Sequence, residues 1–379
     1  MSASQCRLPR IPSHYYVYCD PPDKSGEEVL HFVSSQRRVK LKGRSFREFV
    51  QQVVPLLDGR HSFAEILAEV NDLFRAEDLA ASLDLLLANG LLEDSSDWQL
   101  DSGAQDRLRP QLNLLHDLSL QPMESQQRLS RACVTVFALN GVGTAAARSL
   151  VAAGIGEVRC VDDAVVGPAD MYFSPEFTSQ DRGTLRCDAM RLHFDREAAQ
   201  VNLKTHTARL LDETAIEETI AGSDFVINCT DEGNVSLVYK LNRVCLRNKI
   251  PWISATASGL EVLVGPTVYP GETACYLCYR MRMVACANDP ETSFDFESFL
   301  DRRRSDDSSH RANLVFGTAM AGQLAGVEAL KALIRTDLVA TRGRVRVFDL
   351  RDLSSAMHVV LRKPWCPACF ANWDQETGL

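Results

Sequence analysis

The sequence predicts two folded parts: a small α+β domain first, and a larger α/β domain with a parallel sheet after it. Three observations support this division. Short alternating stretches and then amphipathic helical stretches fill residues 15–88. An apolar strand, a glycine turn, a helix and a second strand begin at residue 133. Two Cys-x-x-Cys pairs lie far apart in the second part, as in sites where two pairs hold one metal ion.

Composition narrows the classes of function. Of the 379 residues, 45% are hydrophobic and 24% are charged, which is typical of a globular protein and excludes wholesale disorder. The net charge is −9, whereas a general nucleic-acid-binding protein usually carries a positive excess. No apolar run reaches the roughly 18 residues of a membrane span, and the start, MSASQCRLPRIP, lacks the apolar core of a signal peptide. We therefore expect a cytoplasmic protein that binds neither nucleic acid nor membrane.

Residues 1–98 form the first predicted domain, which begins with three short strands. Apolar and aromatic residues dominate the stretches 15–18 and 29–33, and residues 38–42 (RVKLK) alternate basic and apolar side chains. Strict alternation is the pattern of a strand with one buried face. Gly43 ends the third strand.

Three amphipathic helices follow these strands. Ser45 with Glu48, and Ser62 with Glu65, each match the capping box that begins a helix. The third helix carries Leu79, Leu83, Leu86 and Leu87. An Asn-Gly pair then ends it. Strands packed with three small helices predict a winged-helix domain.

A polar stretch, residues 99–130, follows this domain, and its weak leucine stripe predicts a linker helix. Residues 131–379 form the predicted α/β domain. Apolar runs in it predict further strands at 224–229, 252–256 and 344–348. Residues 288–309 are polar and of mixed charge, so we expect a mobile loop over one face.

The α/β domain begins with a strand–turn–helix–strand unit. An apolar strand leads into the turn Asn140-Gly141-Val142-Gly143, and the second strand, residues 156–161, ends at Asp162. A glycine turn at a helix start, with an acid about 20 residues later, is the layout of a Rossmann-like nucleotide-binding unit. Ala138 and Asn140 stand where glycines are expected, so a plain turn without a ligand is the alternative.

The two Cys-x-x-Cys pairs carry the most specific signal. They are Cys275 with Cys278, and Cys366 with Cys369. Each pair places two thiolates on one tight turn, and a closed zinc site takes four such ligands at the corners of a tetrahedron. We therefore predict a structural zinc site, because four protein thiolates leave no open coordination position. Four reduced thiols, or a redox role for either pair, are the alternatives.

From Val134 to Cys369 the sequence resembles the ThiF/MoeB superfamily, the adenylating domain shared with ubiquitin-activating enzymes. The matching stretches keep the family's order: VTVFALNGVGTAAARSLVAAGIGEVRCVDDAVV, DFVINCTDEGN, LNRVCLRNKIPWISATASG, VYPGETACYLC, NLVFGTAMAGQLAGVEALKAL and KPWCPAC. The resemblance implies a Rossmann-like ThiF-type fold, a homodimer, and a family zinc site formed by the same four cysteines.

Members of this superfamily activate a carboxylate as an acyl-adenylate with ATP and magnesium. The resemblance implies that Gly141 and Gly143 belong to the phosphate-binding turn, that Asp162 is the ribose-binding acid, and that Asp231 holds magnesium. These residues define the predicted nucleotide site.

Other positions depart from the family pattern. A usual third acid is replaced by Ala164, and the family's Asn-Leu-x-Arg stretch begins here with Asp170 and ends with Phe173. The usual lysine is Arg186, which lacks the compact ammonium group of lysine. Adenylyl transfer depends on cations that neutralise developing phosphate charge. The predicted nucleotide site therefore looks degenerate, and we expect no adenylation by this chain.

The N-terminal block resembles the PqqD-like recognition element of peptide-modification systems, which binds a precursor's leader peptide as an added strand. The predicted edge is formed by Arg38, Val39, Lys40, Leu41 and Lys42. The helix with Leu79 and Leu83 is expected to wall the groove. The basic residues suit an acidic leader. Alternatively, these charges are solvated and protect an edge strand from aggregation. A winged-helix domain could also bind DNA, but the net negative charge of the protein disfavours DNA binding.

A chain that combines a recognition element with a ThiF-like domain resembles the ocin-ThiF-like proteins, which are partners of YcaO cyclodehydratases. This resemblance implies a chain that captures a leader peptide and presents the core peptide to a YcaO enzyme, which forms azoline rings. The alternative is an enzyme of the pantocin and microcin type that itself adenylates a carboxylate or amide of the bound peptide. ATP and magnesium are implied only by this alternative.

Overall fold

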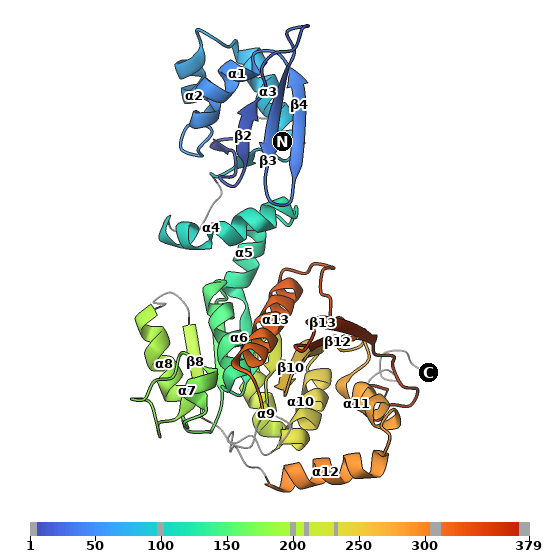
Figure 1. The fold of residues 1–379 in the computed structure, drawn as a ribbon. Helices are drawn as coiled ribbons and strands as arrows, with labels where there is room; N and C mark the ends of the chain where they lie inside the picture. Colours follow the sequence, from blue (N-terminus) through green and yellow to red (C-terminus); the bar gives the residue numbers. More distant parts are fainter. Residues whose placement is uncertain are drawn as a thin grey trace. The chain divides into compact units, whose positions relative to one another are not determined.

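The chain folds into two compact units, Met1–Gln126 and Gln127–Leu379. The structure is a computed structural model that describes residues 6–96, 102–197, 202–207, 212–230, 234–303 and 312–370. Figure 1 shows the elements of both units, and the boundary falls within helix α5 (Pro122–Arg131).

A three-stranded antiparallel sheet forms one side of the first unit. Its strands are β2 (Tyr16–Cys19), β3 (Glu28–Val33) and β4 (Arg38–Gly43), in the order β2-β3-β4. β4 is therefore an edge strand of this sheet. Its residues alternate between exposed and half-buried, as the RVKLK pattern predicts. A separate two-stranded pair joins β1 (Pro9–Arg10) to β5 (Glu93–Asp94).

Helices complete the core of the first unit. They are α1 (Phe46–Glu48), which continues as η2 (Phe49–Val53) and η3 (Val54–Leu56), then α2 (Phe63–Val70) and α3 (Ala76–Ala88). The predicted box at Ser62 forms, since Ser62 Oγ accepts from the N–H of Glu65 and the Glu65 carboxylate accepts from the N–H of Ser62. The predicted box at Ser45 is wrong. Ser45 has a left-handed backbone (φ 58°), and its side chain makes no capping bond, which requires an extended N-cap residue.

The stretch predicted as one linker helix contains two helices in its described part. α4 (Ser102–Asp117) ends at a left-handed Ser119, and α5 begins after a left-handed Gln121. Asp117 accepts hydrogen bonds from Ser34 Oγ (2.7 Å) and pairs with His14 Nε2 (2.8 Å). The end of α4 is therefore fastened to the sheet-bearing part of the first unit.

An eight-stranded mixed sheet forms the centre of the second unit. Its order is β13-β12-β11-β10-β9-β6-β7-β8. The bounds are β6 Cys133–Phe137, β7 Glu157–Val161, β8 Asn202–His206, β9 Phe225–Asn228, β10 Trp252–Ser258, β11 Glu261–Val268, β12 Arg344–Asp349 and β13 Ser354–Val359. Strands β6 to β10 run parallel and the last three antiparallel. This order confirms the α/β class, and the order of the parallel strands reverses between β6 and β9.

Helices α6 (Gly141–Ala152) and α13 (Val315–Leu333) pack together against the sheet (Figure 1). A Cβ atom on Gly322 would lie 2.2 Å from the carbonyl oxygen of Val142, so glycine is needed where the two backbones meet. Other helices of the second unit are α7 Asp170–Phe173, α8 Arg186–Glu197, α9 Glu213–Ile220, α10 Val235–Arg247 and α11 Tyr276–Ala285.

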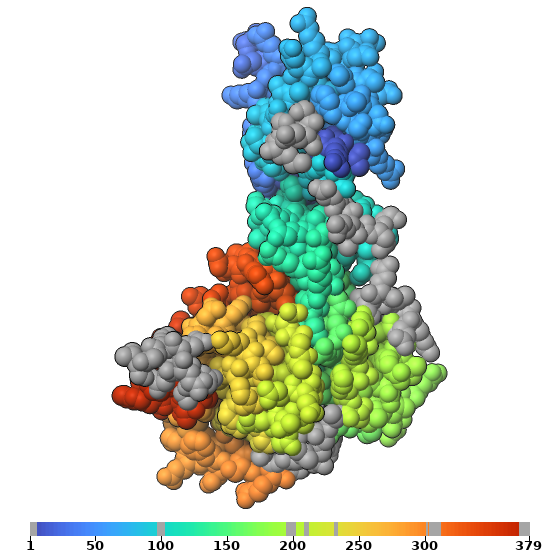
Figure 2. All heavy atoms as spheres, turned by 180° about the vertical axis from the view of Figure 1, so that it is seen from behind, coloured from blue at the N-terminus to red at the C-terminus, as the bar shows by residue number. Residues whose placement is uncertain are grey.

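The loop predicted over residues 288–309 is wrong for much of its length, because Pro290–Arg303 forms helix α12. Pro290 stands at the helix start, where proline is favoured, and the N–H of Thr292 donates to the Asp289 carboxylate. The polar, mixed-charge composition of the segment led to the loop prediction, although these two helix-start signals are present in the sequence. The helix lies at the surface of the second unit (Figure 2). Among the described residues, no helix has the length and apolar character that crossing a membrane requires.

Candidate functional site

The predicted nucleotide-binding residues gather at the carboxyl ends of the parallel strands. The turn at residues 138–143 follows β6, Asp162 follows β7, and Thr230 follows β9. Open α/β sheets bind ligands at this edge, beside the point where the strand order reverses. Asp231, the predicted magnesium ligand, lies outside the described residues.

Asn140 occupies the start of helix α6. Its Oδ1 accepts hydrogen bonds from the N–H groups of Val142 (3.0 Å) and Gly143 (3.2 Å), and its Nδ2 donates to the carbonyl of Cys229 (2.8 Å). Exposed N–H groups at a helix start are the donors that bind phosphate in a glycine-rich turn. Here two of these N–H groups donate to the Asn140 side chain. The same side chain also connects the turn after β6 to Cys229 at the end of β9.

The backbone of the glycine turn is nevertheless retained. Ala138 has a left-handed backbone (φ 71°), which favours glycine. A Cβ on Gly143 would lie 1.7 Å from the carbonyl oxygen of Ala138, and one on Gly141 would lie 2.8 Å from Cβ of Phe173. The two predicted glycines are therefore required for close packing. Phe173, at the position where the family resemblance predicts an arginine, lies against Gly141 through its Cβ atom and carbonyl oxygen.

Arg186 lies between two carboxylates. Its Nη1 is 3.3 Å from Asp162 Oδ2, and its Nη2 is 2.9 Å from Asp170 Oδ1. All three residues are buried, with exposed fractions of 7%, 8% and 3%. Burial alone would lower the pKa of the guanidinium, but Asp162 and Asp170 more than offset this, so its pKa is raised. Arg186 is therefore a fixed, fully charged member of an ion-pair cluster.

The carboxylate of Asp162 is also occupied by the backbone. It accepts from the N–H groups of Leu139 (2.6 Å) and Ala164 (2.7 Å) in addition to Arg186. Two carboxylates around one guanidinium leave a net negative charge in this cluster. Such a field opposes the approach of a triphosphate. The described side chains of the predicted nucleotide site therefore hold the sheet edge together and offer no unpaired cation to phosphate.

The four predicted metal ligands meet in one buried cluster. The sulfur of Cys275 lies 3.7 Å from that of Cys366 and 3.9 Å from that of Cys278, and Cys278 is 3.6 Å from Cys369. Four sulfurs each about 2.3 Å from a zinc ion would have S–S distances of about 3.8 Å. Thiol hydrogen bonds from Cys275 and Cys369 lower the pKa of Cys278. The geometry and chemistry fit zinc, which these four side chains would hold as a structural ion.

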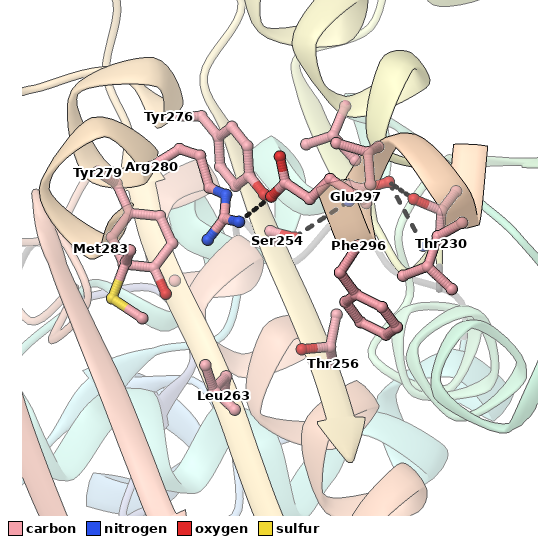
Figure 3. Close-up of a pocket in the computed structure, with 15 residues that line it drawn as sticks. Thr230, Ser254, Thr256, Leu263, Tyr276, Tyr279, Arg280, Met283, Phe296 and Glu297 are labelled. Atoms are coloured by element: carbon pink, nitrogen blue, oxygen red, sulfur yellow. Dashed lines mark hydrogen bonds and ion pairs between the residues drawn. The ribbon is translucent and has the colours of Figure 1, made fainter. Parts of the chain in front are cut away.

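A cavity of about 300 Å³ opens beside the same sheet edge (Figure 3). Asn228 and Thr230, at and after the end of β9, line it together with Ser254, which pairs with Asn228 from within β10. Helices α11 and α12 contribute its walls, with the side chains of Tyr276, Tyr279, Arg280, Met283, Phe296, Glu297 and Leu300. Sequence reasoning missed this cavity, because the segment that forms one wall was predicted as a loop.

An ion pair spans the cavity between its two helical walls. Arg280 on α11 contacts Glu297 on α12, and both side chains are largely buried (Figure 3). The spacing of Phe296, Phe299 and Leu300, three and four residues apart, could have indicated a helix there.

The predicted peptide-binding residues separate into two groups. Arg38, Lys40 and Lys42 are exposed on β4, and Val39 and Leu41 are half-buried between them. The prediction that Leu79 and Leu83 wall a groove is wrong. Both are 0% exposed, because they face inward from α3 and pack in the core of the first unit.

Replacing Asn140 with alanine is expected to destabilise the second unit by about 1–2 kcal/mol, because two helix N–H groups and the Cys229 carbonyl lose their partner. The thermal transition of the full chain should fall by about 2–8 °C in differential scanning calorimetry. Asn234→Ala is a matched control, since Asn234 begins α10 without a side-chain capping bond. Equal shifts in both variants would show that the Asn140 bridge adds no stability.

Replacing Cys366 with serine is expected to abolish zinc binding, because one corner of the tetrahedron is lost. The zinc content of dialysed protein, measured by inductively coupled plasma mass spectrometry, should fall from about one ion per chain to near zero. Cys286→Ser is the control, because Cys286 is an exposed thiol outside the cluster. Unchanged zinc in the Cys366 variant would contradict the four-cysteine site.

Sequence comparison identifies relatives among adenylyltransferases. The chain is 26% identical over 257 residues to the sulfur carrier protein ThiS adenylyltransferase of Escherichia coli K12, covering 68% of this chain and 92% of that protein. It is also 26% identical over 250 residues to the molybdopterin-synthase adenylyltransferase of Salmonella typhimurium LT2, covering 65% and 90% of the two chains.

Solved structures share the fold at low sequence identity. E. coli MccB, crystallised with MccA, matches with a TM-score of 0.68 and 15% identity, covering 96% of this chain and 99% of that one. PaaA matches with a TM-score of 0.68 and 19% identity, covering 92% and 99%. The model of the ThiF family matches residues 112–368, which is more than half of the sequence. Together with the eight-stranded sheet and its glycine turn, this match shows that the chain belongs to the ThiF family.

Proposed function

We propose that this chain binds the leader of a ribosomally made precursor peptide and presents the core peptide to a YcaO-type cyclodehydratase. In this proposal the chain does not itself adenylate. The observation that carries the proposal is the edge strand β4, whose outer edge pairs with no other described strand and which offers two half-buried apolar side chains and three exposed cations. An extended peptide adds to such an edge by main-chain hydrogen bonds, and side-chain contacts give specificity.

The architecture of the first unit supports a PqqD-like, winged-helix recognition element. A three-stranded antiparallel sheet and the helices α2 and α3 share one core, which includes Phe32, Ile66 and Leu79. The fold match to MccB covers 96% of this chain and so extends into the first unit. MccB was crystallised with MccA, and we infer a comparable partner, a precursor peptide, for this chain.

The state of the nucleotide site supports a role without adenylation. Asn140 caps the helix start that would bind phosphate, and Arg186 is held by Asp162 and Asp170. A protein that tethers a leader raises the effective concentration of the core peptide at a partner enzyme, and this needs no catalytic residue of its own. We further propose that the four cysteines hold a structural zinc ion and that the chain forms a homodimer.

The leader-binding proposal predicts that Leu41→Glu weakens binding by about tenfold or more, because a buried charge would replace an apolar contact. The measurement is fluorescence anisotropy of the full chain with a labelled leader peptide encoded by a neighbouring short gene. Leu353→Glu is the control, as Leu353 is an exposed leucine of the second unit. Circular dichroism must show that the Leu41 variant is folded. Unaltered affinity in a folded Leu41 variant would remove the strand-addition model.

A second candidate is an enzyme that adenylates a carboxylate or amide of the bound peptide. The cavity favours it, because Thr230 in its lining directly precedes Asp231, the predicted magnesium ligand, and because Arg280 lines its wall. Asp162 and Arg186 would then be working residues, and the ion-pair cluster would have to open for nucleotide.

Pyrophosphate release separates the two candidates. The purified chain is incubated with ATP, magnesium and its precursor peptide, without a YcaO enzyme. The leader-presenting role predicts release no faster than in the absence of peptide. Peptide-dependent release that is lost in Asp162→Asn would establish the enzyme instead.

A further inference from the structure

The two faces of β4 differ in chemistry, and the pairing with β3 shows which residue belongs to which face. Val39 lies opposite Phe32, and Leu41 lies opposite Leu30, whose side chain is buried in the core. These positions therefore share the face that the helices cover. Lys40 lies opposite His31 on the other face. Arg38 and Lys42 share that outer face, because side chains two residues apart point the same way.

The outer face carries a regular row of three exposed cations. Arg38, Lys40 and Lys42 are all exposed, and in the described part of the chain none of them forms a salt bridge. Alternate residues of a strand lie about 6.6–6.8 Å apart. A strand added beside β4 places its own alternate residues at the same spacing, so each cation gains one cross-strand neighbour.

The helix-covered face offers different neighbours. Val39 and Leu41 are half-buried at the border of the first unit's core. The side chains of an added strand that point to this face cover the remaining exposed surface of these two residues. Apolar side chains are favoured there, because burying a charge beside them without a partner is costly.

We propose that the segment captured by β4 alternates acidic and apolar residues over about five positions, with the acids opposite Arg38, Lys40 and Lys42. This inference rests on the proposed leader-binding function and specifies the class of peptide. The recognised feature is the order of the residues, since a shift by one position puts every acid on the apolar face. A second copy of this chain is disfavoured as the occupant, because two β4 edges would bring like charges together.

Two labelled peptides of equal composition test the order. One contains EVELE between Gly-Ser flanks, and the other contains EEEVL between the same flanks. Fluorescence anisotropy with the full chain is expected to give at least about tenfold tighter binding of EVELE, with weakening as salt rises. Equal affinities would overturn the alternation.

Charge reversal tests the contact itself. Lys40→Glu is expected to weaken EVELE binding about tenfold, and EVKLE, with lysine at the centre, should restore binding to this variant. Arg60→Glu is the matched control, because Arg60 is an exposed cation of the first unit outside β4. No loss in the Lys40 variant, or a change in its oligomeric state by analytical ultracentrifugation, would overturn the proposed contact.

Binding of the natural leader peptide shows whether only the alternating pattern is wrong or the leader-binding function itself. If it binds the chain in a Leu41-dependent way while EVELE and EEEVL bind equally, the alternation is wrong and leader binding stands. If it does not bind at all, the leader-binding function fails and the alternation fails with it.

Discussion

The carboxylate of Asp162 ties together four segments of the second unit. It accepts from the backbone before α6 and from the loop after β7, and it pairs with Arg186 at the start of α8, which also binds Asp170 at the start of α7. A buried arginine of this kind is stable only while its partners remain, and removing one partner typically costs about 3–5 kcal/mol. The sheet edge that would receive a ligand is therefore organised around an internal ion-pair cluster, and the chemistry available there follows from this cluster.

Two further interactions connect distant segments of the second unit. The cysteine cluster joins the start of α11 to the segment after β13, which are far apart in sequence, within one apolar core. The ion pair between Arg280 and Glu297 connects α11 to α12 across the cavity. The fold of a ThiF family domain is thus retained, while at the start of α6 the Asn140 side chain accepts from two N–H groups and Phe173 lies against Gly141.

The first unit uses a different kind of interaction. Its chemistry lies on an open sheet edge, where backbone groups and alternating side chains are exposed together. An edge strand of this kind can bind an extended peptide without any catalytic residue, and we therefore propose a leader-binding role and not adenylation.

Local patterns in the sequence determined much of this architecture. Alternation of basic and apolar residues predicted β4, and the Ser62 capping box predicted α2. The spacing of the two cysteine pairs predicted that the four sulfurs lie in one cluster. These signals are readable because each depends on residues a few positions apart. Tertiary structure alone decided that Leu79 and Leu83 lie inside the core, that residues 290–303 form a cavity wall, and that Asp170 neutralises Arg186. Each of these depends on which distant segment packs against a residue, and periodicity carries no information about that partner.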